Sequence, residues 1–153
     1  MRRFLLYWLP VLIWMGVIFF LSTDMGSSAH TSRILEPLLR WLKPDISAEA
    51  LEQAHFLVRK GGHLSEYALL AVLWWRVLMH VHAEGRVRPA WFCALMALLI
   101  ATAYAATDEY HQTFVASRGA SVHDVMIDSC GALLGVILVL LWHGWRIRLA
   151  RRA

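Results

Sequence analysis

The stretch FLLYWLPVLIWMGVIFFL occupies residues 4–21 and contains no charged side chain. A helix that crosses a bilayer needs about 20 mainly apolar residues, and within lipid its backbone polar groups must bond to one another. The stretch therefore predicts a membrane-spanning helix over about 4–22. Its apolar part is longer than that of a cleaved signal peptide and no Ala-x-Ala pattern follows it, so we expect it to be retained.

Three further apolar stretches follow along the chain. They predict spanning helices over about 63–82, 90–107 and 125–145, the first of which is interrupted by Glu66 and Arg76. Hydrophobic residues make up 59% of the 153 residues and charged residues only 17%, which excludes a disordered chain and a soluble domain of this size. We predict an all-α integral membrane bundle of four transmembrane helices, with the whole chain forming one domain.

The distribution of positive charge predicts the orientation. Cytoplasmic loops of membrane proteins are enriched in Lys and Arg. If the N-terminus is cytoplasmic, nine basic residues lie on the inner side and six on the outer side, and the C-terminus is cytoplasmic as well. The basic segment 146–152 directly follows a predicted span, which is typical of anchoring to anionic lipid. We therefore expect the bilayer as a partner, and no nucleic acid.

A long outer connection, residues 22–62, separates the first two predicted spans. It contains Pro37 and Pro44, which interrupt helices. Ser47 can cap a short helix over 48–60. Two interpretations of this helix stay open: its apolar face lies in the membrane interface, or the helix is a solvated part of the loop.

Most of the unusual polar residues lie at the outer ends of the predicted spans. Residues three or four positions apart share a helix face, and the spacing Gly131-x-x-x-Gly135 is typical of close helix packing in membranes. Ionisable residues on such faces point into the bundle, where they are functional candidates. The group consists of Lys60, His63, Glu66, Tyr67, Asp108, Glu109, His111, Gln112, Arg118, Asp124 and Asp128.

The order of these residues resembles the VanZ-like membrane family, which is named for a teicoplanin-resistance protein. The matching elements are Lys60-Gly-Gly-His63-Leu-Ser-Glu-Tyr67, Asp108-Glu109-Tyr-His-Gln112, Arg118-Gly-Ala-Ser121-Val-His-Asp124, and Gly131 to Gly135. The resemblance implies a multi-pass protein of the bacterial cytoplasmic (inner) membrane, sometimes linked to reduced sensitivity to glycopeptide antibiotics. It does not imply a defined reaction.

The first functional hypothesis is the binding or processing of an anionic, lipid-linked or envelope-related ligand at the outer leaflet. Lys60 and Arg118 would hold a phosphate or pyrophosphate, because Arg offers a bidentate fork and Lys a point charge. His63 or His111 would transfer protons near neutral pH. The candidate catalytic residues are His63, Asp108, Glu109, His111 and Asp124. The candidate ligand-binding residues are Lys60, Glu66, Tyr67, Gln112, Arg118 and Asp128.

A divalent cation is a candidate cofactor of this site. Carboxylate oxygens are the ligands that Mg²⁺ and Ca²⁺ prefer. The residues that offer them here are Asp108, Glu109 and Asp124. A zinc site made of His63, Glu66 and His111 is a weaker alternative, because the chain lacks a compact ligand motif such as His-Glu-x-x-His.

The second hypothesis is a non-enzymatic scaffold or interaction protein whose polar cluster is structural. The ion pairs expected in that case are Arg118 with Asp108 or Asp124, and Lys60 with Glu66. An ion or solute carrier is a weaker interpretation, because no polar face runs through the inner halves of the predicted spans. The oligomeric state stays open.

Overall fold

The computed structural model describes residues 1–24, 28–80, 88–116 and 118–152, and every regular element among them is helical. A short π-helical segment, Phe4–Trp8 (η1), leads into α1 (Leu9–Ser22). The remaining helices are α2 (Ser28–Leu42), α3 (Ala48–His80), α4 (Ala90–Gln112) and α5 (Val122–Ala150). The predicted all-α class is confirmed. The last two residues of the predicted span 63–82 lie outside the described residues.

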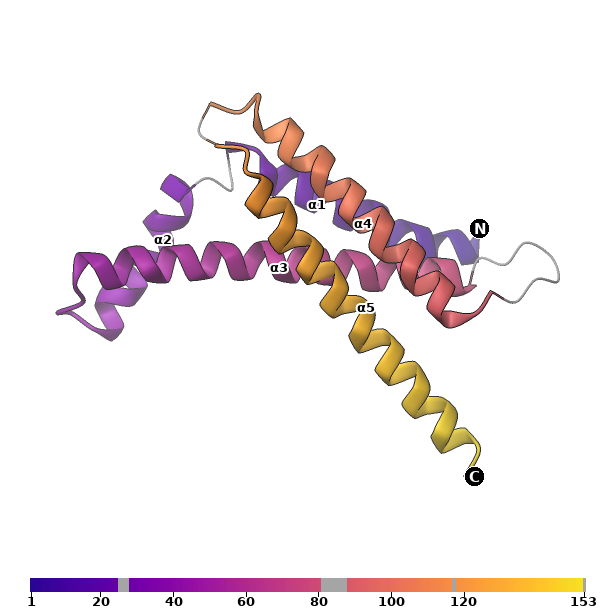
Figure 1. Cartoon of the computed structure of the whole chain (residues 1–153). Helices are drawn as coiled ribbons and strands as arrows, with labels where there is room; N and C mark the ends of the chain where they lie inside the picture. The colour runs from indigo at the N-terminus through magenta and orange to yellow at the C-terminus, as the bar shows by residue number, and fades with distance from the viewer. Residues whose placement is uncertain (25–27, 81–87, 117, 153) are drawn as a thin grey trace.

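Helix α3 is the centre of the bundle. It packs against α1, α2, α4 and α5, and Figure 1 shows the other helices arranged around it. The sequence predicted a separate helix over 48–60. The predicted end of this helix is wrong, because α3 continues unbroken through Gly61 and Gly62. Each glycine lowers helix propensity by about 1 kcal/mol relative to alanine. Packing against every other helix outweighs that penalty.

Three segments are long and apolar enough to cross a membrane, namely Phe4–Ser22, Ala90–Gln112 and Val122–Ala150. They indicate a multi-pass membrane protein. The prediction of four spans is corrected to three candidates, since the described part of α3 contains no comparable apolar window. The central position of α3 explains its composition: His63 and Tyr67 are buried against other helices, so this helix carries polar residues without exposing them to lipid.

Helix α2 occupies part of the outer connection and is not predicted by the sequence analysis. Pro37 lies inside it, where the missing N–H removes one backbone hydrogen bond without ending the helix. Figure 1 shows α2 beside the N-terminal half of α3. There Ser32 Oγ and His55 Nδ1 are hydrogen-bonded at 2.9 Å. Ile34 and Trp41 are 78% and 77% exposed, so α2 leaves large apolar side chains uncovered.

Helices α3 and α5 cross in close contact at two glycines. A methyl group added at Gly131 would lie 2.9 Å from the Cα of Leu64, and one added at Gly135 would lie 3.0 Å from the Cα of Ala68. Carbon atoms in contact normally lie about 3.5–4.0 Å apart. This crossing therefore depends on the absence of side chains at the two positions. Helix α4 adds a stripe of fully buried small residues, Ala97, Ala101 and Ala105.

Candidate functional site

A cluster of buried polar residues lies where the C-terminal ends of α1 and α4 meet the middle of α3 and the start of α5. Its carboxylates are almost completely buried. The exposed fraction is 4% for Asp108 and Glu109, 3% for Asp124 and 0% for Asp128. A buried carboxylate requires a cation, hydrogen-bond donors or a metal ion. The partners of these four groups therefore decide what the cluster can do.

Asp124 is bound by two basic residues of α3. It lies in the first turn of α5, where the helix dipole favours negative charge. Lys60 Nζ donates to Asp124 Oδ1, and the Arg59 guanidinium lies 3.8 Å from Asp124 Oδ2. The expected pairing of Lys60 with Glu66 is therefore wrong, because Lys60 reaches across to α5 instead.

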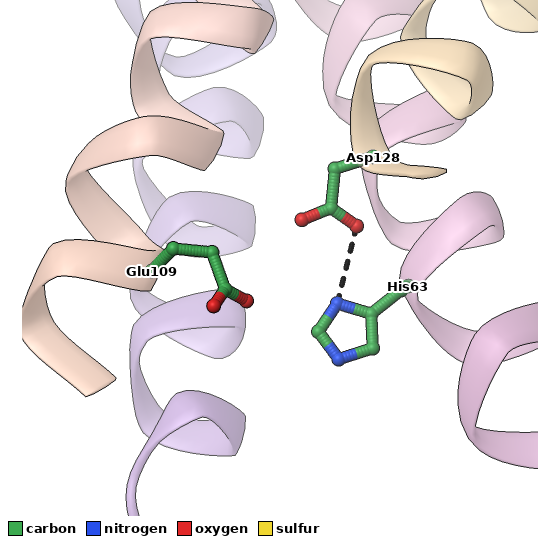
Figure 2. A group of neighbouring side chains, drawn as sticks. All are labelled: His63, Glu109 and Asp128. Atoms are coloured by element: carbon green, nitrogen blue, oxygen red, sulfur yellow. Dashed lines mark hydrogen bonds and ion pairs between the residues drawn. The ribbon is translucent and has the colours of Figure 1, made fainter. Parts of the chain in front are cut away.

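His63 and Asp128 form a second link between α3 and α5. The distance from His63 Nδ1 to Asp128 Oδ1 is 3.1 Å, and Figure 2 shows the other ring nitrogen pointing away from Asp128. The second oxygen of Asp128, Oδ2, is buried and has no hydrogen-bond partner. A carboxylate in this position fixes the orientation of the imidazole and leaves its other nitrogen for a proton or a ligand.

Gln112 joins the two carboxylates at the end of α4. Its Nε2 donates to Asp108 Oδ2 at 3.2 Å and to Glu109 Oε1 at 3.1 Å. Glu109 Oε2 accepts the backbone N–H of Ser121, the N-cap residue of α5, at 2.9 Å. Glu109 therefore positions the start of α5. Neither Asp108 nor Glu109 belongs to an ion pair among the described residues.

Arg118 is held by the C-terminal end of α1. Its Nη2 donates to the Leu21 carbonyl, and its Nε donates to the Thr23 carbonyl at 3.3 Å. Carbonyls at a helix C-terminus lack helical partners and attract cations. Within the described part of the chain, Arg118 forms neither of the expected ion pairs with Asp108 or Asp124. Burial lowers the pKa of Arg118 from its ordinary value, yet guanidinium remains charged near neutral pH.

A cavity of about 190 Å³ opens beside the cluster. This is several times the space that one water molecule requires, so the cavity has room for a small polar group. The apolar lining residues are Ile18, Leu21 and Val58. The cationic or protonatable lining residues are Arg59, His63 and Arg118, and the acidic ones are Glu66 and Asp108. The cavity thus offers groups of both charges together with apolar side chains.

Two of the candidate residues lie outside this network of contacts, and a third contributes to the cavity. Tyr67 is fully buried, its hydroxyl has no hydrogen-bond partner, and its ring centroid lies 6.4 Å from that of Tyr104. The His111 ring packs against Phe19 with 4.5 Å between the centroids. Glu66 lines the cavity, but it forms no ion pair with any described residue. Tyr67 and His111 therefore lie outside the network, whereas Glu66 meets His63, Asp108 and Arg118 as a lining residue of the cavity.

The ligand atoms that lie close enough to share one metal ion come from His63, Glu109 and Asp128. One such atom from each residue lies within 4.8 Å of the other two, and Figure 2 shows the three side chains facing one another from three helices. This group differs from both ligand sets expected from the sequence. Among the described residues, the ligand atoms of the expected zinc set, His63, Glu66 and His111, are not brought together in this way.

Arg59 and Ser22 are lining residues of the cavity that the sequence did not point to as site residues. Arg59 precedes Lys60, and two consecutive basic residues on the side where basic residues are disfavoured were a usable signal. Ser22 ends α1, and its buried hydroxyl lies beside Asp108. A serine at the end of an apolar stretch gives no such signal, because serine is also common at helix ends that have no functional role.

These features define a class: an all-helical, multi-pass membrane protein with a buried carboxylate–histidine cluster at one end of the bundle. The chain belongs to the VanZ/LLP1 family, whose model matches residues 6–143 and so includes every residue of the cluster. The resemblance noted from the sequence is confirmed. Neither the curated proteins nor the solved structures contain a significant match to the chain.

Proposed function

We propose that the protein binds the phosphate or pyrophosphate group of an anionic, lipid-linked envelope molecule in the cavity beside the polar cluster. The observation that carries the proposal is the lining of that cavity. Two residues with guanidinium groups, Arg59 and Arg118, line it together with apolar residues that include Leu21 and Val58. A lipid phosphate has the same division, with a charged head directly attached to an apolar chain. Guanidinium groups suit phosphate because they bind it with paired N–H donors.

The proposed role of His63 is proton transfer to or from the bound group. Imidazole changes its protonation near neutral pH, and Asp128 holds the ring from one side. Lys60 and Asp124 are proposed to act indirectly, by fixing α3 against α5, since their charges are directed at each other. This division narrows the sequence-based hypothesis, in which Lys60 contacts the ligand itself.

We place the cavity at the outer face of the bacterial cytoplasmic membrane, with the N-terminus inside. The support for this orientation is the excess of basic residues on the opposite side of the predicted spans. A protein that binds an envelope precursor there would alter the sensitivity of the cell to glycopeptide antibiotics.

The test is lipid binding to the full chain, purified in detergent and observed by native mass spectrometry. The probes are a long-chain polyprenyl phosphate and the uncharged polyprenol of the same length. We expect binding of the phosphate only, and a loss of about tenfold or more in Arg59→Gln, because a hydrogen bond to a charged group contributes about 1.5–3 kcal/mol. Arg33→Gln, an exposed arginine of α2, is the matched control. Equal binding of both probes, or equal losses in both variants, would contradict the proposal.

A structural scaffold is the second candidate function, and one observation favours it. Three ion pairs of the cluster join α3 to α5, namely those of Arg59 and Lys60 with Asp124 and that of His63 with Asp128. Under this alternative, charge-removing variants lower stability and leave lipid binding unchanged. Unfolding measurements on the Arg59→Gln protein used for lipid binding therefore distinguish the two functions.

A further inference from the structure

We propose that His63, Glu109 and Asp128 form a binding site for one divalent transition-metal ion of the Zn²⁺ type. The three residues come from α3, α4 and α5, and one ligand atom from each lies within 4.8 Å of the others. Metal–ligand bonds of about 2.0–2.2 Å require these atoms to move together by only about 1 Å. Figure 2 shows the three side chains directed toward a common space.

An unsatisfied oxygen independently points to a ligand at this place. Asp128 has no exposed surface, and its Oδ2 has no hydrogen-bond partner, although His63 occupies Oδ1. A carboxylate oxygen that is removed from water without a donor is costly, and native structures satisfy nearly all such groups. A cation next to Asp128 Oδ2 supplies the missing partner.

The charge balance of the cluster leads to the same conclusion. Asp124 has Lys60 and Arg59, and Asp128 has His63, but Glu109 receives only an amide and a backbone N–H. One divalent ion would compensate Glu109 and the remaining oxygen of Asp128 together. It would also offset the acids that line the cavity and that otherwise repel a phosphate group.

The ligand set decides the class of ion. One imidazole and two carboxylates suit Zn²⁺, Mn²⁺ or Fe²⁺ better than Ca²⁺ or Mg²⁺, which prefer oxygen ligands alone. Three protein ligands leave at least one position for water or an incoming oxygen. His63 belongs both to this group and to the lining of the cavity, so the ion would lie at the edge of the proposed phosphate site. With the ion bound, His63 would act as its ligand, and the proton-transfer role proposed above would apply to the metal-free site.

The experiment measures metal binding alone, without any lipid phosphate, so that this inference and the proposed function can fail separately. The full chain in detergent is stripped with EDTA, reloaded with Zn²⁺ and analysed by elemental mass spectrometry, and Co²⁺ absorption reports the ligand geometry. We expect one ion per chain. Asp128→Asn and Glu109→Gln should each weaken binding about 100-fold or more, since even residues behind the ligands change affinity by about 10–100-fold.

The matched controls are His123→Gln and Asp45→Asn, which change an exposed histidine and an exposed aspartate. Both should bind Zn²⁺ like the original protein, and excess Mg²⁺ should not displace Co²⁺. Size-exclusion chromatography and circular dichroism identify the variants that fold. If Asp128→Asn does not fold, the conclusion is drawn from Glu109→Gln. The inference is overturned if the original protein binds no Zn²⁺, if the controls lose as much as the site variants, or if Mg²⁺ displaces Co²⁺.

Discussion

Replacing Gly131 with alanine should damage the whole polar cluster, although the new methyl group is apolar and lies inside a helix. Gly131 packs on the backbone of Leu64, the residue that follows His63, and it lies one helical turn beyond Asp128. The perturbation therefore acts at the point where α5 brings Asp128 to His63.

The size of the effect follows from the distances at the crossing. The added methyl carbon would lie 2.9 Å from both the Cα and the carbonyl carbon of Leu64, whereas carbon atoms in contact lie about 3.5–4.0 Å apart. These carbon contacts alone require a local separation of about 0.6–1.1 Å, and the Leu64 carbonyl oxygen lies closer still to the added methyl group. The bond between His63 Nδ1 and Asp128 Oδ1, now 3.1 Å, would then exceed hydrogen-bonding distance. Overpacking and the loss of this charged hydrogen bond together destabilise the protein by about 3–5 kcal/mol.

The assay is reversible unfolding of the detergent-solubilised protein by increasing SDS, followed by the fluorescence of its eight tryptophans. Gly144→Ala is the matched control, because it lies on the same helix and its new methyl group would meet nothing within 4 Å. Alanine is the better helix former, so this control should be unchanged or more stable by up to about 1 kcal/mol. A second readout, the ¹⁵N NMR signal of the His63 ring, should show the loss of the hydrogen bond in Gly131→Ala alone.

A specific result would refute the reasoning. If Gly131→Ala unfolds within about 0.5 kcal/mol of the original protein, as surface substitutions do, α3 and α5 are not in close contact at this position. If stability falls but the His63 signal is unchanged, the crossing does not control the geometry of the site.

Three further predictions concern single contacts of the cluster. Lys60→Met should lower the free energy of unfolding by about 3 kcal/mol, because it leaves Asp124 with only the more distant Arg59. Adding Asp124→Leu should restore most of this stability. A double variant whose loss equals the sum of the two single losses would contradict a direct ion pair. Glu109→Gln should weaken its bond to the Ser121 N–H, with a loss of about 1–2 kcal/mol and faster amide hydrogen exchange at the start of α5 only. Tyr67→Phe should leave stability unchanged or raise it by about 1 kcal/mol, because the buried hydroxyl has no partner; a clear loss of stability or of ligand binding would mean that the hydroxyl is used.

The apolar stretches predicted most of the fold because the requirements of a bilayer act directly on composition. Residues 4–22 contain an uninterrupted apolar run, and the structure places a helical segment there. The continuity of α3 was harder to predict. Gly61 and Gly62 are unfavourable for a helix on local grounds, and the packing that outweighs them involves residues far away in the sequence. Helix α2 was missed for a related reason, since Pro37 suggested a break that the structure does not have.

The sequence predicted which residues gather at one end of the bundle, but not which of them form ion pairs or hydrogen bonds with one another. Helical spacing correctly put Lys60 and His63 on one face of α3, yet both were found to pair with α5, because the close approach of the two helices determines which acids are reached. The hydrogen bond from Arg118 to the Leu21 carbonyl could not be predicted from the sequence. A backbone carbonyl at a helix end is available in every helix, so the side-chain pattern contains no information about it.

The links between α3 and α5 also have a consequence for how the molecule is made. His63 and Asp128 are 65 positions apart, so α3 is synthesised well before the helix that supplies its partners. An aspartate at the centre of a membrane helix makes insertion less favourable by about 2.5–3.5 kcal/mol when it enters alone. If α5 enters beside an α3 that is already in place, Lys60 and His63 can receive Asp124 and Asp128 at once. The polar cluster would then help to dock the last helix during biogenesis, and its ion pairs would exist only in chains whose insertion is complete.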